Sequence, residues 1–297
     1  MENVNKILKK YDIKPYRYER KGKTVIVDSK EKRYVLKPKE KDNEYIYEYL
    51  KSRNFDYYPI IINDREYEIT EYIDEVDMPE EQKLSDMIDL VSLLHNKTTH
   101  FKEIDLADYK EIYEDIQNNI EYLKSYYTDI ITLIESKVYM SPSEYLLARN
   151  ISKIFGAIEF SKDQIDKWYE LVSDKRKQRQ VVLHNNLDLS HFIRGSSPYL
   201  INWSKSRIGT PIFDIYKLYK RHALDYDFEE ILKHYERNYP LLEEEKKLFD
   251  ILVSLPNKIE FNKNELEMCD LISKEIDLLI KTENLISPQY LKERIKE

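Results

Sequence analysis

The hydrophobic pattern of this chain changes its period once, near residue 74. Up to Tyr72 the apolar residues come in short runs between turn residues, which predicts strands. From Leu84 onward they recur at helical spacing almost throughout. We therefore expect an α+β protein with a small β-rich lobe at residues 1–74 and a large helical lobe at residues 75–297. The strands that we expect in the first lobe are Tyr16–Glu19, Thr24–Val27, Arg33–Lys37, Pro59–Ile62 and Tyr67–Tyr72, and its helices are residues 3–11 and Asn43–Lys51.

The composition excludes several classes of protein. The 297 residues carry a formal net charge of -8 with acidic and basic residues interleaved, so we expect no basic surface for nucleic acid. No apolar run approaches the roughly 20 residues that a membrane helix needs, and the N-terminus has no apolar signal core. The single Cys269 excludes an intramolecular disulfide and fits a reducing compartment. We expect a cytoplasmic protein with no nucleic-acid and no membrane partner.

Glycine is scarce, with 4 in the chain. Loops that bind phosphate need glycine, because their backbone approaches the phosphates closely and adopts positive φ. The turn at Lys21-Gly22-Lys23 has one glycine and no Gly-x-Gly. We expect an ordinary hairpin turn there.

The segment from Val181 to Asp214 interrupts the helical pattern. It reads Val-Val-Leu-His-Asn-Asn-Leu-Asp-Leu-Ser-His-Phe-Ile, then Tyr-Leu-Ile-Asn-Trp after a short turn, then Gly-Thr-Pro-Ile-Phe-Asp. Short strands are expected at Val181–Leu183, Phe192–Ile193 and Tyr199–Ile201. The segment resembles the catalytic half of the aminoglycoside phosphotransferase and choline kinase group of the protein-kinase-like superfamily. The motifs of that group are His-x-Asp-x-x-x-x-Asn, Ile-Asp-Trp and Gly-x-Pro-x-x-Asp, and its spore-coat CotS-type branch, with variable catalytic residues, is nearest in character.

Three residues depart from these motifs. Asn186 stands where the group has the aspartate that accepts or orients the substrate hydroxyl proton, and losing such a base costs about 10²–10⁴ in rate. His191 and Asn202 stand at the two metal-ligand positions, where neutral imidazole suits Mg²⁺ poorly and an amide lacks the charge of a carboxylate. The resemblance thus implies that these positions hold neither a catalytic residue nor a metal. Asp188 is a candidate for a displaced base.

Other residues of the resemblance are retained. Lys37 ends the strand Tyr-Val-Leu-Lys, where the group has a lysine that grips the nucleotide phosphates and pairs with a helix glutamate. Glu44 and Glu48 on the next helix are the candidate partners, and a surface lysine among many is the alternative. The resemblance implies structural roles for His184 and Asp214.

The resemblance implies a two-lobed kinase-like fold and a catalytically inactive protein, a pseudokinase. Such a protein would act as a binding or scaffolding component, for example of the bacterial spore coat, with other proteins as partners and no cofactor. The alternative is an active ATP-dependent small-molecule phosphotransferase, in which Asp188 is the base, Lys37 holds ATP, and Mg²⁺ is required. A third alternative, an unrelated helical protein with a chance match, predicts no β-rich first lobe.

Overall fold

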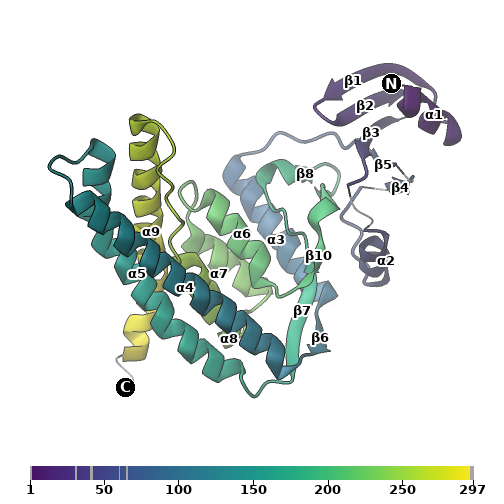
Figure 1. Cartoon of the computed structure of the whole chain (residues 1–297). Coiled ribbons are helices and arrows are strands. Elements are labelled where there is room, and N and C mark those ends of the chain that lie inside the picture. The colour runs from purple at the N-terminus through teal and green to yellow at the C-terminus, as the bar shows by residue number, and fades with distance from the viewer. Residues whose placement is uncertain (1, 31, 41–42, 60, 65, 295–297) are drawn as a thin grey trace. The chain divides into compact units, whose positions relative to one another are not determined.

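The chain divides into two compact units, each made of two segments. The computed structural model describes residues 2–294 except 31, 41–42, 60 and 65 (Figure 1). The first unit is Met1–Thr99 with Val181–Gly209, and the second is His100–Gln180 with Thr210–Glu297. The lobe boundary that we expect at residue 74 separates strand-rich from helix-rich sequence and not these two units. It stays a prediction.

An antiparallel sheet forms the N-terminal part of the first unit. Lys21 pairs with Thr24 across a two-residue turn in which Gly22 has φ 60, a conformation that glycine adopts without steric cost. The expected hairpin is therefore confirmed. Residue 60, within the predicted strand Pro59–Ile62, lies outside the described residues. The sheet has the order β1-β2-β3-β5-β4, with β1 (Pro15–Lys21), β2 (Thr24–Ser29), β3 (Arg33–Pro38), β4 (Ile61–Asn63) and β5 (Tyr67–Glu71).

Helix α1 (Glu2–Lys10) packs on one face of this sheet. Side chains alternate between the two faces of a sheet along each strand. The residues before and after a core residue therefore point to the opposite face. Ile26, Val35 and Lys37 therefore lie on the face opposite α1, where the candidate site is found. The core between helix and sheet consists of Val4, Ile7, Leu8, Ile13, Val27, Leu36 and Ile69.

Asp64 ties α1 to the turn between β4 and β5. Its carboxylate accepts hydrogen bonds from the Lys10 ammonium at 2.5 Å, the Tyr11 hydroxyl at 3.1 Å and the Glu66 backbone N–H at 3.2 Å. The bond from Lys10 and then that from Glu66 lower the pKa of Asp64 to about 2. The charged form of this carboxylate therefore stabilises the packing of α1.

The rest of the first unit surrounds the segment after β7 (Lys177–Leu183). The predicted short strands are confirmed, since β7 ends at Leu183 and β8 (Phe192–Arg194) pairs with β9 (Pro198–Leu200). The sequence pattern did not predict β10 (Arg207–Gly209), which forms by pairing with Val181–Leu183. The other elements are α2 (Glu44–Ser52), α3 (Glu80–Thr98) and the short 3₁₀ helices η1 (Leu189–His191) and η2 (Trp203–Lys205).

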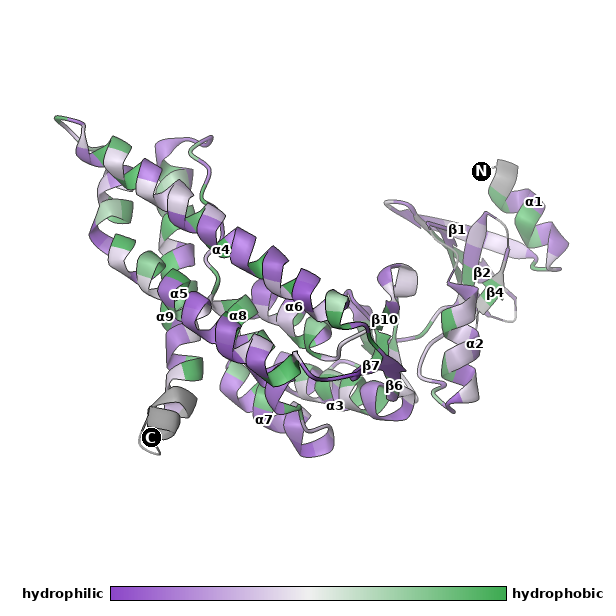
Figure 2. Cartoon of the chain, turned by 60° about the horizontal axis from the view of Figure 1, so that its bottom comes forward, coloured by the Kyte–Doolittle hydropathy of each residue, from purple (hydrophilic) through white to green (hydrophobic). Residues whose placement is uncertain are grey.

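The second unit is mostly helical. A capping box starts helix α5 (Pro142–Val172), because Ser141 Oγ accepts from the Glu144 N–H and the Glu144 carboxylate accepts from the Ser141 N–H. Figure 2 shows hydrophobic and hydrophilic residues interspersed along α5 and along α4 (Leu106–Glu135), as in helices that bury one face. The elements are β6 (His100–Glu103), α4 (Leu106–Glu135), α5 (Pro142–Val172), α6 (Ile212–His222), α7 (Phe228–Asn238), α8 (Glu243–Ser254) and α9 (Glu265–Arg294).

The fold class is α+β, as predicted from the change of period. The antiparallel sheet at the N-terminus rules out the alternative of an unrelated helical protein. Within the described ranges, no helix combines the length and the apolar character needed to cross a membrane.

The substitution Asp64→Asn should lower the free energy of unfolding by about 1–2 kcal/mol at pH 7, because it removes the charge that Lys10 and the Glu66 N–H stabilise. The pKa of Asp64 is lower in the folded protein than its unfolded value of about 4. The contribution is therefore present above pH ~4 and is lost as the pH falls toward 2. Urea denaturation of both proteins across this range measures it.

Asp129→Asn, at an exposed position of α4, is the matched control and should leave the free energy of unfolding within about 0.5 kcal/mol. A difference between wild type and Asp64→Asn that is equally large at pH 2 and pH 7 would contradict this role for the carboxylate.

Candidate functional site

The loop after β7 begins with a buried histidine. His184 is fully buried, and its Nε2 is hydrogen-bonded to the Ile201 carbonyl oxygen at 2.9 Å. Its ring lies edge-on to Trp203 with 4.8 Å between centroids, and the Trp203 indole N–H donates to the Leu200 carbonyl at 2.7 Å. His184 thus joins the loop to the segment that follows β9, which suits the structural role expected for it.

Two asparagines of the site have left-handed backbones. Asn185 has φ 61 and Asn202 has φ 67, and asparagine tolerates this region better than most residues. The Asn185 amide Nδ2 donates to the Lys205 carbonyl at 2.8 Å, which fixes the loop to η2. The turn at Asn202 comes directly before η2.

A chain of hydrogen bonds joins the three substituted positions. His191 Nδ1 lies 2.7 Å from the Asn186 carbonyl oxygen, and Asn202 Nδ2 lies 2.9 Å from His191 Nε2. Because a carbonyl oxygen only accepts, Nδ1 carries the ring proton, and Nε2 of the neutral ring accepts from the Asn202 amide. The lone pair with which His191 would bind a metal is therefore occupied by Asn202.

These residues do not fit Mg²⁺. The cation is usually bound through one or two carboxylates, whereas Asn186, His191 and Asn202 offer two neutral amides and an imidazole and no carboxylate. Across the described part of the chain, no group of three or more His, Cys, Asp or Glu side chains could hold a metal ion.

Asp188 caps the short helix η1. Its Oδ1 accepts from the Ser190 N–H at 2.9 Å and from the Ser190 hydroxyl at 2.6 Å. This is the usual arrangement of an N-cap aspartate. The contacts direct this carboxylate to its own loop.

A cavity of about 400 Å³ opens on the sheet face opposite α1. Gly195, between β8 and β9, permits a close approach there, since a Cβ at this position would lie 2.7 Å from Ile73 Cγ2. One wall is apolar, and Lys37, Tyr47, Glu68 and Asn202 add polar groups. The apolar residues include Ile26, Val35, Ile73, Ile193, Ile201 and Trp203.

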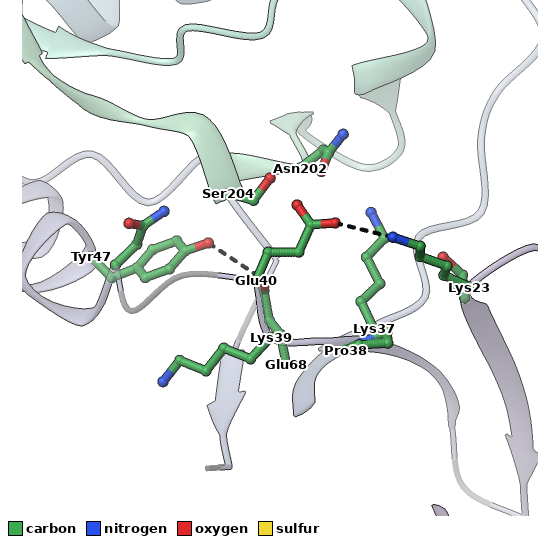
Figure 3. A pocket seen from close by; sticks show the side chains of 11 residues that line it. Lys23, Lys37, Pro38, Lys39, Glu40, Tyr47, Glu68, Asn202 and Ser204 are labelled. Carbon is green, nitrogen blue, oxygen red and sulfur yellow. Dashed lines mark hydrogen bonds and ion pairs between the residues drawn. The ribbon is translucent and has the colours of Figure 1, made fainter. Parts of the chain in front are cut away.

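A second cavity of about 230 Å³ shares its polar end with the first (Figure 3). Lys23 and Glu40 form an ion pair at 3.9 Å across it. Lys37 and Lys39 also line it, so three lysines and two glutamates, Glu40 and Glu68, surround one space. The cavity is therefore charged but close to balanced.

The sheet places Glu68 next to Lys37. The two residues are paired in register between β3 and β5, and the Tyr47 hydroxyl donates to Glu68 Oε1 at 3.1 Å. Burial, together with the charge of Glu68, raises the pKa of Tyr47, so the phenol stays protonated. Figure 3 shows the Lys37 side chain directed toward the side of the cavity where Asn202 lies.

The predicted partner Glu44 lies elsewhere. It is the first residue of α2, is exposed, and lines neither cavity. In the part of the chain that the structure describes, no ion pair of Lys37 within 4.0 Å is found. The structure thus brings together Lys37 and Asn202 of the predicted residues and adds Glu68 and Tyr47.

Sequence reasoning also missed Asn43. Its Nδ2 donates to the Trp203 carbonyl at 2.7 Å and to Ser206 Oγ at 3.3 Å, and the side chain is buried. Asn43 and Trp203 are 160 positions apart, so no local pattern indicates the contact. The alternation of β5 was the only signal for Glu68, since its neighbour Ile69 faces the core.

Asp214 belongs to the second unit. It is fully buried in the first turn of α6, where an acid is favoured by the helix dipole. Its burial is in keeping with the structural role that the resemblance implies.

Several solved structures that are similar to the chain are phosphotransferases or kinases of small molecules. An aminoglycoside phosphotransferase from Alicyclobacillus acidocaldarius has a TM-score of 0.74 at 11% identity, covering 96% of this chain and 94% of its own. A spectinomycin phosphotransferase has a TM-score of 0.55 at 14% identity, covering 98% and 94%. Choline kinase LicA from Streptococcus pneumoniae has 0.50 at 16% identity, covering 93% and 98%. The chain therefore has the kinase-like fold seen in aminoglycoside phosphotransferases and choline kinase.

Comparison of the sequence alone finds no relative of this chain. No family model matches the chain, and no curated protein matches it significantly. The likeness is one of fold, which does not fix an activity.

We expect the ring of His191 to be the Nδ1–H tautomer, because Nδ1 donates to the Asn186 carbonyl and Nε2 accepts from Asn202. Long-range ¹H–¹⁵N NMR spectra of the histidine side chains at pH 8 distinguish the two tautomers. The partly buried His222, near Asp225, is the internal reference. A ring of His191 protonated at Nε2 would contradict the arrangement described here.

Proposed function

We propose that the protein is a kinase-like binding protein that does not transfer phosphoryl groups, a pseudokinase. The observation that carries the proposal is the hydrogen bond between His191 and Asn202 at 2.9 Å. Phosphoryl transfer in kinases depends on metal ions that bridge and neutralise the phosphates. Two neutral side chains bonded to each other are a poor substitute for two metal ligands.

The base position supports the same proposal. The side chain of Asn186 is buried at this position, and the backbone carbonyl of the same residue is hydrogen-bonded to His191. An amide side chain cannot accept the proton of a substrate hydroxyl at neutral pH. A general base contributes about 10²–10⁴ to a rate, and loss of metal stabilisation comes on top of that.

The cavity on the sheet face supports binding. Its volume of about 400 Å³ and its mixture of apolar and polar lining residues suit a small organic molecule. Lys37 would contact an anionic group of the ligand, while Glu68 and Glu40 oppose a high negative charge. We infer a ligand of low net charge.

The wider role is proposed from the resemblance. The segment Val181–Asp214 is similar to the spore-coat CotS-type branch, so the protein is proposed as a cytoplasmic scaffold whose partners are other proteins and which is incorporated into the spore coat. Immunolabelling of sporulating cells tests that location.

An active ATP-dependent small-molecule phosphotransferase is the second candidate. Two observations favour it. Solved structures with a similar fold are an aminoglycoside phosphotransferase and a choline kinase, and Lys37 lines the cavity on the sheet face opposite α1. It requires Asp188 to act as a base, although the carboxylate of Asp188 accepts two bonds from Ser190.

We expect no ATP turnover with choline, spectinomycin or aminoglycosides as acceptors, because the base and both metal ligands are neutral side chains. A coupled assay of ADP release with Mg²⁺, at high enzyme concentration, measures this. Turnover in the wild type that disappears in both Lys37→Met and Asp188→Asn would overturn the proposal in favour of the second candidate.

A restored variant provides the positive control. The combined substitutions Asn186→Asp, His191→Asn and Asn202→Asp return the three motif residues, and this protein should bind ATP more tightly with Mg²⁺ than without it. The wild type and the single variant Asn186→Gln, which keeps an amide, should show no such gain.

A further inference from the structure

The second unit contains a cavity of its own, of about 240 Å³. Residues of α4, of α6 and of the segment that ends α8 line it. Its apolar surface is formed by Ile116, Leu252, Leu255 and Pro256. Its polar groups are a lysine and a tyrosine on α6, an aspartate and an asparagine on α4, and Asn257 after α8.

Lys220 and Tyr216 lie one turn apart on α6 and both face this cavity. The Lys220 ammonium donates to the Leu255 carbonyl at 3.3 Å and to Asn257 Oδ1 at 3.5 Å. Both distances exceed the about 2.7–3.2 Å usual for such bonds. Burial lowers the pKa of Lys220 and raises that of Tyr216, so both groups have lost much of their water. The ammonium would therefore gain from a stronger acceptor.

One of the two acceptors of Lys220, Asn257, is held by further hydrogen bonds. The backbone N–H and Nδ2 of Asn257 donate to the two carboxylate oxygens of Glu275 at 2.6 Å and 2.8 Å. The Tyr127 hydroxyl donates to the Asn257 carbonyl. The wall beside Lys220 is thus fixed, and both oxygens of Glu275 are already engaged.

Asp115 and Asn119 lie one turn apart on α4 and line the same cavity. Both are exposed. Among residues 2–294, with the gaps given above, neither has a side-chain hydrogen bond or ion pair, and the Tyr216 hydroxyl has none either. A carboxylate and an ammonium thus line one small space without forming a pair of their own.

We propose that this cavity binds a small zwitterion of the α-amino acid class. The ligand carboxylate accepts from the Lys220 ammonium and the Tyr216 hydroxyl, and the ligand ammonium donates to Asp115 and to Asn119 Oδ1. An aliphatic side chain packs against Ile116 and Leu252. A simple anion would leave Asp115 unpaired beside it, and a simple amine would meet Lys220. A ligand with both charges fits the two helices.

A purely structural role for Lys220 predicts that the cavity binds no ligand. A lysine can cap the carbonyls at a helix C-terminus, and Leu255 lies directly after α8. A residue with that role alone predicts no ligand, whereas the long bonds of Lys220 and the partnerless groups on α4 predict one.

Calorimetric titration of the full chain with the twenty standard amino acids tests the proposal. We expect at least one to bind, and its decarboxylated and deaminated analogues to bind at least about tenfold more weakly. Lys220→Met and Asp115→Asn should each weaken binding by about tenfold or more, which is about 1.4 kcal/mol. Lys217→Met, on the same helix but outside the cavity, should leave binding unchanged.

Tyr216→Phe provides a second variant that keeps the shape of the side chain, in case Lys220→Met does not fold, and it should also weaken binding. The proposal would be overturned if none of the amino acids binds at concentrations up to about 10 mM, which corresponds to a very weak affinity. Equal binding of the deaminated analogue, or unchanged binding in Asp115→Asn and Tyr216→Phe, would also overturn it.

Discussion

The hydrogen bond between His191 and Asn202 is the interaction on which the account of the first unit depends. It joins two side chains that a kinase would direct at a metal, and it is possible because both are neutral. The motifs have an asparagine and an aspartate at these positions, and a carboxylate at position 202 needs a cation or a hydrogen-bond donor beside it. The amide of Asn202 needs no cation, and it donates to the imidazole of His191.

The groups that hold this part of the fold differ from those that would perform chemistry. His184, Trp203 and Asn43 bond to backbone carbonyls of the segment from Leu200 to Trp203. These contacts keep the backbone of Asn202 in its left-handed turn. The scaffold can therefore persist when the charged side chains are exchanged, because none of these contacts needs a carboxylate or a metal.

The periodicity of the sequence predicts much of the fold, but it predicts only some of the residues of the candidate site. The strands up to Tyr72 and the pair at Phe192 and Leu200 alternate or lie between turn residues, so local pattern predicts them. β6 and β10 form by pairing with β7, and no local pattern marks them. The order of the motifs along the chain identified Lys37 and Asn202 as site residues. Glu68, Tyr47 and Asn43 reach the cavities through strand register and contacts distant in sequence, which one sequence cannot show.

The decisive measurement is calorimetric titration of the wild-type protein with ATP, with and without Mg²⁺. If His191 and Asn202 satisfy each other and bind no metal, either ATP binds in neither condition, or Mg²⁺ changes its affinity by no more than about twofold. Tight binding that requires Mg²⁺ would show that these residues do bind the metal.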